Sequence, residues 1–156
     1  MTQTIEAGST APDFTLPTDG GGQFTLSAQR GKPVVVYFYP KDDTSGCTKE
    51  AINFTEKADE FAAAGATVVG ISKDSVASHD KFKAKHGLNL ILAADVDCTV
   101  CEAFGVWVEK SMYGRKYMGI ERATFLIDGA GKVSRAWRKV KVPGHVDEVL
   151  AAVRDL

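Results

Sequence analysis

The three cysteines are the residues of this sequence best suited to chemistry. Cys47 follows a polar turn and begins a stretch with helical patterning, which puts its sulfur near a helix N-terminus. The partial positive charge and unpaired N–H groups of such an end stabilise a thiolate, the nucleophilic form of cysteine. A cysteine that only fills a core would have apolar neighbours. We therefore interpret Cys47 as a nucleophile, and Gly46 before it lets the backbone approach closely.

The other two cysteines, Cys98 and Cys101, form a Cys-x-x-Cys pair that allows several interpretations. A structural zinc site is disfavoured, because it needs four ligands and the sequence offers no second ligand pair. On a helix, Val96, Val100 and Phe104 would form an apolar arc. Cys101 borders this arc and is expected to pack, whereas Cys98 would point to the polar side and be exposed. Dithiol chemistry at this pair remains an open alternative.

Length and charge limit the classes of protein to which this sequence can belong. The 156 residues suit one domain, expected over residues 1–156. The net charge of −1 provides no basic excess to hold a phosphate backbone, so nucleic acid is not an expected partner. The polar first ten residues do not resemble a secretory signal, and the apolar run 34–39 is too short to span a bilayer. We expect a cytoplasmic protein with reduced thiols.

The elements that would position Cys47 alternate between strand and helix. Segments 14–16 and 24–26 flank a glycine-rich turn and predict a β-hairpin. The patterning then predicts strands at 33–39, 67–71, 90–94, 123–128 and 132–138, and helices at 47–64, 75–86, 97–104 and 145–156. Residues 105–119 are expected to be irregular. This order predicts a thioredoxin-like α/β fold with an N-terminal β-hairpin and a central mixed sheet flanked by helices.

The turn before Cys47 resembles the active-site motif of the peroxiredoxins. Their Pro-x-x-x-Thr-x-x-Cys pattern is present here as Pro40, Thr44 and Cys47. The Val-Val-Tyr-Phe-Tyr-Pro-Lys-Asp stretch that overlaps this motif, and the segment 112–128, resemble the bacterioferritin comigratory protein or peroxiredoxin Q branch. The resemblance runs from about Gly8 to the end of the sequence. It implies a thiol-dependent peroxidase that reduces hydrogen peroxide and organic hydroperoxides.

The resemblance also implies a role for each site residue. Cys47 would be the peroxidatic cysteine, oxidised by the substrate to a sulfenic acid. Thr44 would hydrogen-bond the peroxide oxygens, and Pro40 would shield the sulfur. Arg122, which the residues alone would make a surface arginine, would hold the thiolate and the peroxide. The resemblance implies a monomer and no metal, flavin or haem cofactor.

Regeneration of Cys47 is where the sequence departs from the family. The two usual positions of a resolving cysteine are occupied here by Ile52 and Lys83. The expected reductant is therefore an external thiol such as thioredoxin or glutathione with glutaredoxin. Cys98 would follow a strand two positions from the central one, about 10 Å away. A disulfide needs Cα atoms within about 7 Å, so Cys98 could resolve Cys47 only after local unfolding.

Other functions and other residues remain open from the sequence. A dithiol–disulfide oxidoreductase using Cys98 and Cys101, or a redox sensor with this fold, are the alternatives to a peroxidase. The three histidines are expected at the surface or as helix caps, namely His79, His86 and His145. Three aromatic residues before Arg122 are expected either to cover the core or to line the peroxide pocket, namely Trp107, Tyr113 and Tyr117.

Overall fold

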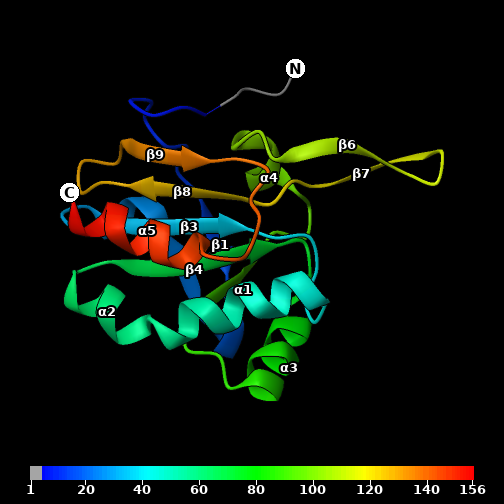
Figure 1. The fold of residues 1–156 in the computed structure, drawn as a ribbon, viewed down its shortest axis with the longest axis horizontal. Helices are drawn as coiled ribbons and strands as arrows, with labels where there is room; N and C mark the ends of the chain where they lie inside the picture. Colours follow the sequence, from blue (N-terminus) through cyan, green and yellow to red (C-terminus); the bar gives the residue numbers. More distant parts are fainter. Residues whose placement is uncertain (1–4) are drawn as a thin grey trace.

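A five-stranded mixed sheet carries the site region and the helices around it (Figure 1). The computed structural model describes residues 5–156, so the first four residues of the expected domain lie outside it. The strand order is β5-β4-β3-β8-β9. The strands are β3 (Val34–Phe38), β4 (Thr67–Ser72), β5 (Ile91–Ala94), β8 (Ala123–Ile127) and β9 (Val133–Trp137). Strands β3, β4 and β5 run parallel, and β8 and β9 complete the sheet in antiparallel pairs.

Strand β3 lies in the middle of the sheet, and its side chains contribute to the apolar clusters on both faces. Val34, Val36 and Phe38 belong to one cluster. Val35, Tyr37 and Tyr39 alternate with them and belong to the other. Every residue of β3 is buried, which explains its continuous apolar sequence.

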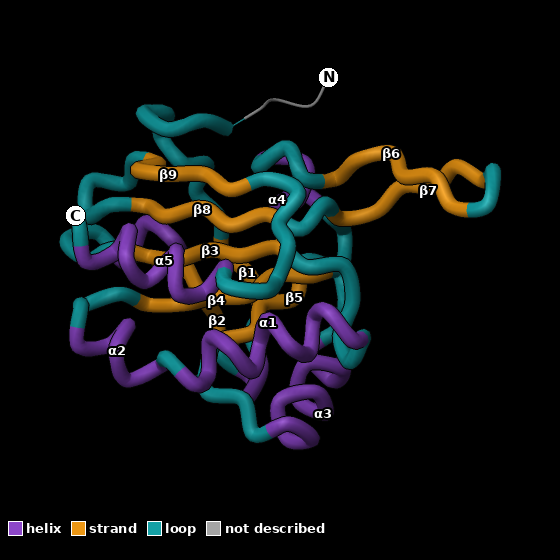
Figure 2. The backbone as a smooth tube through the Cα atoms, viewed as in Figure 1, coloured by secondary structure: helices purple, strands orange, loops and turns teal. Residues whose placement is uncertain are grey.

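Different elements cover the two faces (Figure 2). One cluster is completed by α1 (Ser45–Glu56), α2 (Ala58–Ala63), α3 (Val76–His86) and α5 (His145–Arg154). The opposite cluster is completed by the antiparallel hairpin of β1 (Thr15–Pro17) and β2 (Gln23–Thr25), and by α4 (Thr99–Ala103). Two short 3₁₀ turns flank β2, at Asp19–Gly21 and Leu26–Gln29. The predicted thioredoxin-like fold with an N-terminal hairpin is confirmed.

The helix predicted over 47–64 is two helices. The backbone of Lys57 leaves helical geometry at φ −103° and ψ 9°, between α1 and α2. Phe54 and Phe61 remain buried on either side of this break. Ala62, beyond the break, is exposed.

The segment 105–119, predicted to be irregular, contains a β-hairpin that projects from the body of the protein (Figure 1). Strand β6 (Trp107–Met112) pairs with β7 (Arg115–Ile120) across a two-residue turn at Tyr113 and Gly114. Both turn residues have positive φ, as such tight turns require. Tyr113 is 98% exposed, and Tyr117 is also exposed, so neither covers the core. The half-buried Trp107 does pack against it.

The short helix near the cysteine pair also differs from its prediction. Helix α4 begins at Thr99, and Cys98 has a left-handed backbone with φ 61°, outside the helix. The helical projection therefore does not apply to Cys98, which is 9% exposed and joins the same apolar cluster as Cys101. Val96, expected in the apolar arc, is instead 60% exposed. The expectation that Cys98 is exposed is wrong.

The sheet separates the cysteines. Cys47 belongs to the cluster beneath α1, whereas Cys98 and Cys101 belong to the cluster on the opposite face. All three thiols are free. No helix within residues 5–156 has the length and apolar character to cross a membrane.

Burial predicts a difference in reactivity between the paired cysteines. Cys101 is fully buried. Burial is the main cause that raises the pKa of its thiol far above the ordinary value, and the negative charge of nearby Asp95 adds to it. Burial and Asp95 also raise the pKa of Cys98, but this side chain retains some exposure. We expect iodoacetamide to label Cys98 in the native protein much faster than Cys101, as measured by peptide mass spectrometry over time. Equal rates, or faster labelling of Cys101, would contradict this account.

Candidate active site

Cys47 is the third residue of α1 and lies in its first turn. It follows the loop that leaves the carboxyl end of β3, and its side chain is buried with 1% exposure. Thr44 is the N-cap residue, but its side chain makes no capping bond to the helix. Its Oγ1 donates to the carbonyl oxygen of Lys41 at 2.8 Å instead. The first-turn N–H groups of α1 are therefore not capped by Thr44, and their positive electrostatic potential acts on the sulfur.

Arg122 contacts the sulfur of Cys47, although the two residues are far apart in the sequence. It precedes β8, and the pairing of Ala123 with Phe38 brings it to the end of β3. Its Nη2 donates to Cys47 Sγ at 3.3 Å, and its Nη1 donates to Glu50 Oε1 at 2.7 Å. Burial lowers the pKa of Arg122, but Glu50 and Cys47 outweigh it and raise that pKa above its ordinary value. The sequence alone would have left this arginine at the surface.

Gly46 leaves room for the guanidinium of Arg122. A Cβ at position 46 would lie 3.2 Å from Arg122 Nη2, which is closer than ordinary van der Waals contact. Any larger residue would push the guanidinium away from Cys47. The close approach expected of Gly46 is therefore made by the Arg122 side chain.

Glu50 is a site residue that the sequence reasoning missed. It lies three residues after Cys47, on the same face of α1, and is fully buried. Burial raises the pKa of Glu50 to about 7, and Arg122 opposes this rise. Its Oε2 has no hydrogen-bond partner among the described residues, nor does the buried hydroxyl of Tyr37. The i, i+3 spacing of an acid after Cys47 was the available signal.

Thr44 and Pro40 lie in the same loop but contribute differently to the geometry. Thr44 is exposed, and Pro40 is half-buried before the loop turns toward α1. The hydrogen bonds within residues 5–156 include none between Thr44 and Cys47. The structure thus brings Arg122 into contact with both Cys47 and Glu50. Pro40 and Thr44 lie in the loop that precedes Cys47.

Two histidines expected at the surface are buried. His145 lies 2.8 Å from Thr124 Oγ1 through its Nε2, and burial lowers its pKa to about 4, so it is neutral at pH 7. His79 is fully buried against Asp42. The only signal for either would have been the apolar neighbours on its helix.

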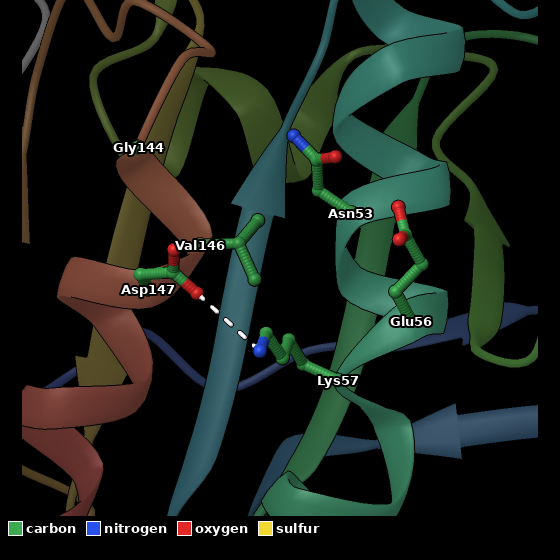
Figure 3. Close-up of a pocket in the computed structure, with 6 residues that line it drawn as sticks. All are labelled: Asn53, Glu56, Lys57, Gly144, Val146 and Asp147. Atoms are coloured by element: carbon green, nitrogen blue, oxygen red, sulfur yellow. Dashed lines mark ion pairs between the residues drawn. The ribbon is translucent and has the colours of Figure 1, made fainter.

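A surface pocket lies elsewhere, between α1 and α5 (Figure 3). Its lining includes Asn53, Val146 and the ion pair of Lys57 and Asp147 at 3.9 Å. Both partners are exposed, and such a pair contributes little. The lining contains neither Cys47 nor Arg122, so this pocket is separate from the candidate site.

Comparison with known proteins identifies the family. The AhpC/TSA family model matches residues 7–136. The chain belongs to this family. It is 56% identical to a putative peroxiredoxin Bcp of Coxiella burnetii over 94% of this chain and 97% of that protein. A structure of peroxiredoxin Q from Xanthomonas campestris matches with a TM-score of 0.89 and 48% identity, covering 99% of this chain and 97% of that one.

The same comparisons place the chain in the Bcp or peroxiredoxin Q branch, so it is a thiol peroxidase. A structure of the X. campestris bacterioferritin comigratory protein matches with a TM-score of 0.88 and 47% identity, covering 99% of this chain and 98% of that one. That structure belongs to a set of trapped intermediate and ligand complexes that concern the alkyl peroxide reduction activity of the X. campestris protein. The resemblance seen in the sequence is confirmed.

Replacing Arg122 by lysine tests whether the planar guanidinium matters. Lysine keeps the charge but cannot donate to Cys47 and Glu50 in the same fixed geometry. We expect Arg122→Lys to lower the second-order rate constant of the peroxide reaction by about 10- to 100-fold. Arg135→Lys, which changes an exposed arginine on β9, serves as the matched control. An unchanged rate constant for Arg122→Lys would place this residue outside the reaction.

The raised pKa of Glu50 predicts a pH dependence of stability. Between pH 4.5 and about 7, the folded state keeps a proton that the unfolded state has released, so the stability falls as the pH rises. At about 1.4 kcal/mol per pKa unit, the rise from 4.5 to about 7 corresponds to a loss of about 3 to 4 kcal/mol, most of which occurs by pH 7. His145, with its lowered pKa, acts in the opposite direction between about pH 4 and 6.5. The informative quantity is therefore the difference between wild type and Glu50→Gln.

Urea unfolding at pH 5, 6, 7 and 8 measures this difference. Relative to wild type, Glu50→Gln should gain stability from pH 5 to 8, with most of the gain reached by pH 7. Glu56→Gln, on the exposed side of the same helix, is the control and should follow wild type throughout. A Glu50→Gln difference that does not vary with pH would show that Glu50 ionises at its ordinary pKa.

Proposed function

We propose that Cys47 is the peroxidatic cysteine and that the substrates are hydrogen peroxide and organic hydroperoxides. The observation that carries this assignment is the 3.3 Å contact between Arg122 Nη2 and Cys47 Sγ at the first turn of α1. Among residues 5–156, no arginine donates to the sulfur of Cys98 or Cys101, and burial raises the pKa of both thiols. The X. campestris relative associated with alkyl peroxide reduction supports an organic hydroperoxide as one substrate class.

The reaction uses the thiolate of Cys47 as the nucleophile. Sγ attacks one peroxide oxygen, the O–O bond breaks, and its electron pair leaves with the other oxygen. That oxygen takes a proton to become an alcohol or water, and Cys47 becomes a sulfenic acid. Arg122 would donate hydrogen bonds to the sulfur and the attacked oxygen, where negative charge shifts. Thr44 would hydrogen-bond the peroxide, and Pro40 would limit the access of water to the sulfur.

We further propose that an external thiol regenerates Cys47. A thiol attacks the sulfenic sulfur, releases water and forms a mixed disulfide, which a second thiol then reduces. Neither usual resolving position can do this, because Ile52 and Lys83 carry no thiol. The position of Cys98 on the other face of the sheet argues against its role as a resolving cysteine. Thioredoxin, or glutathione with glutaredoxin, supplies suitable thiols.

The setting of this activity is part of the same proposal. Three free cysteines suit the reducing cytoplasm, where thiol reductants are abundant. We expect the protein to work as a monomer, because Cys47, Glu50 and Arg122 meet within one chain. The alternative dithiol activity at Cys98 and Cys101 is disfavoured by the burial of both sulfurs.

Replacing the proposed nucleophile tests the assignment. Cys47→Ser should abolish peroxide consumption with a thiol reductant, since a serine hydroxyl does not ionise at neutral pH. The fold should remain intact, because the substitution is nearly isosteric. The double variant Cys98→Ser with Cys101→Ala is the matched control and should keep the activity. The assignment is wrong if Cys47→Ser still turns over or if the double variant does not.

A further inference from the structure

A buried polar cluster lies beside the active-site loop, with Asp42 at its centre. The Asp42 side chain is almost fully buried and accepts three hydrogen bonds. Tyr39 donates to Oδ1 at 2.6 Å, Ser78 Oγ donates to Oδ2 at 2.8 Å, and His79 Nδ1 lies 2.7 Å from Oδ2. A buried carboxylate with this many donors is held in one orientation.

His79 links this carboxylate to the sheet. It lies on α3 and has no exposed surface. Its Nδ1 faces Asp42, and its Nε2 lies 3.0 Å from the carbonyl oxygen of Ala93 on β5. Asp42 and the Ala93 carbonyl are both hydrogen-bond acceptors, and the ring lies between them. The ring therefore connects the loop to α3 and to the end of β5.

The backbone of the same loop is held by Asp74, which lies just after the end of β4. The N–H of Asp42 donates to Asp74 Oδ2 at 2.8 Å, and Ser72 Oγ donates to the same oxygen at 2.7 Å. The carbonyl of Lys41, one residue earlier, accepts the hydroxyl of Thr44. The loop that carries Thr44 and leads into Cys47 is thus fixed from α3 and β4, and only its last part joins α1.

We propose that Asp42 and His79 are positioning residues for the peroxide reaction. They hold the loop from Pro40 to Thr44 so that the Thr44 hydroxyl and the first turn of α1 keep their places around Cys47. Among the described residues, neither Asp42 nor His79 forms a hydrogen bond with the sulfur of Cys47, so both act through the loop. This inference rests on the proposed role of Cys47.

The test compares two reactions of the same sulfur. Reaction with hydrogen peroxide needs the sulfur and its surrounding donors to be aligned on two oxygens. Reaction with iodoacetamide needs only a thiolate and access. A loss of positioning therefore slows the peroxide reaction selectively, whereas a general loss of thiolate slows both reactions together. Thermal unfolding of each variant, followed by circular dichroism, reports the stability separately.

Asp42→Ala removes all three acceptor contacts and should lower the rate constant with peroxide by about 10- to 100-fold. Its rate of labelling at Cys47 by iodoacetamide should not fall. Asp42→Asn should recover most of the peroxide rate, because the amide keeps the size and shape of the side chain and its oxygen can still accept from Tyr39. Asp43→Asn is the matched control, since Asp43 is the next residue and its pairs with Lys85 and His86 are at the surface. It should react like wild type.

Two results would overturn the proposal, namely an unchanged peroxide rate for Asp42→Ala, or an equal fall in both reactions. If Asp42→Ala does not fold, Tyr39→Phe carries the same test. It removes one hydrogen bond, keeps the ring, and should slow only the peroxide reaction, by about threefold. Loss of peroxide consumption in Cys47→Ser tests the role of Cys47, and the ratio of the Asp42→Ala rate to the wild-type rate tests Asp42. The two failures are therefore distinguishable.

Discussion

The guanidinium of Arg122 is the interaction on which the site depends, because it is shared between a sulfur and a carboxylate. Nη2 donates a hydrogen bond to the sulfur of Cys47, and Nη1 donates one to the carboxylate of Glu50. One positive charge therefore contacts two acidic side chains, both of which are buried. Burial alone would favour the neutral form of Glu50. Arg122 offsets this effect, and the bare Cα of Gly46 lets it come close enough to do so.

The sheet supplies the geometry for this pairing. Strand β3 delivers the loop and α1, and antiparallel β8 returns the chain so that Arg122 reaches the same end of the sheet. Helix α3, which contributes no atom to the contact with Cys47, anchors the loop through Asp42 and His79. The site is therefore assembled from segments that are far apart in sequence, and packing on both faces of β3 holds them together.

The sequence predicted the parts whose burial leaves a pattern. The apolar run at 33–39 and the helical patterning at 75–86 are both local signals, and the predicted strand and helix are confirmed as β3 and α3. The hairpin of β6 and β7 was missed because its strands are largely exposed and lack an alternating apolar face. Cys98 was misplaced because a helix was assumed to begin before its left-handed residue.

Site residues were predictable where a motif carried them. Cys47, Thr44 and Pro40 came from one short pattern, whereas Arg122 came only with the family resemblance. Glu50, Asp42 and His79 depend on contacts between α1, the active-site loop, α3 and β8. Residue type and spacing do not specify such contacts, because a buried charge is revealed only when its partners are brought to it.

The most direct test of the account is mass spectrometry of the intact and digested protein after one equivalent of hydrogen peroxide, without a reductant. The account predicts a sulfenic acid at Cys47, with Cys98 and Cys101 still reduced and no disulfide formed. Added thioredoxin or glutathione should then restore the Cys47 thiol. Oxidation first at Cys98 or Cys101, or a disulfide joining Cys47 to Cys98 or to Cys101, would contradict this account.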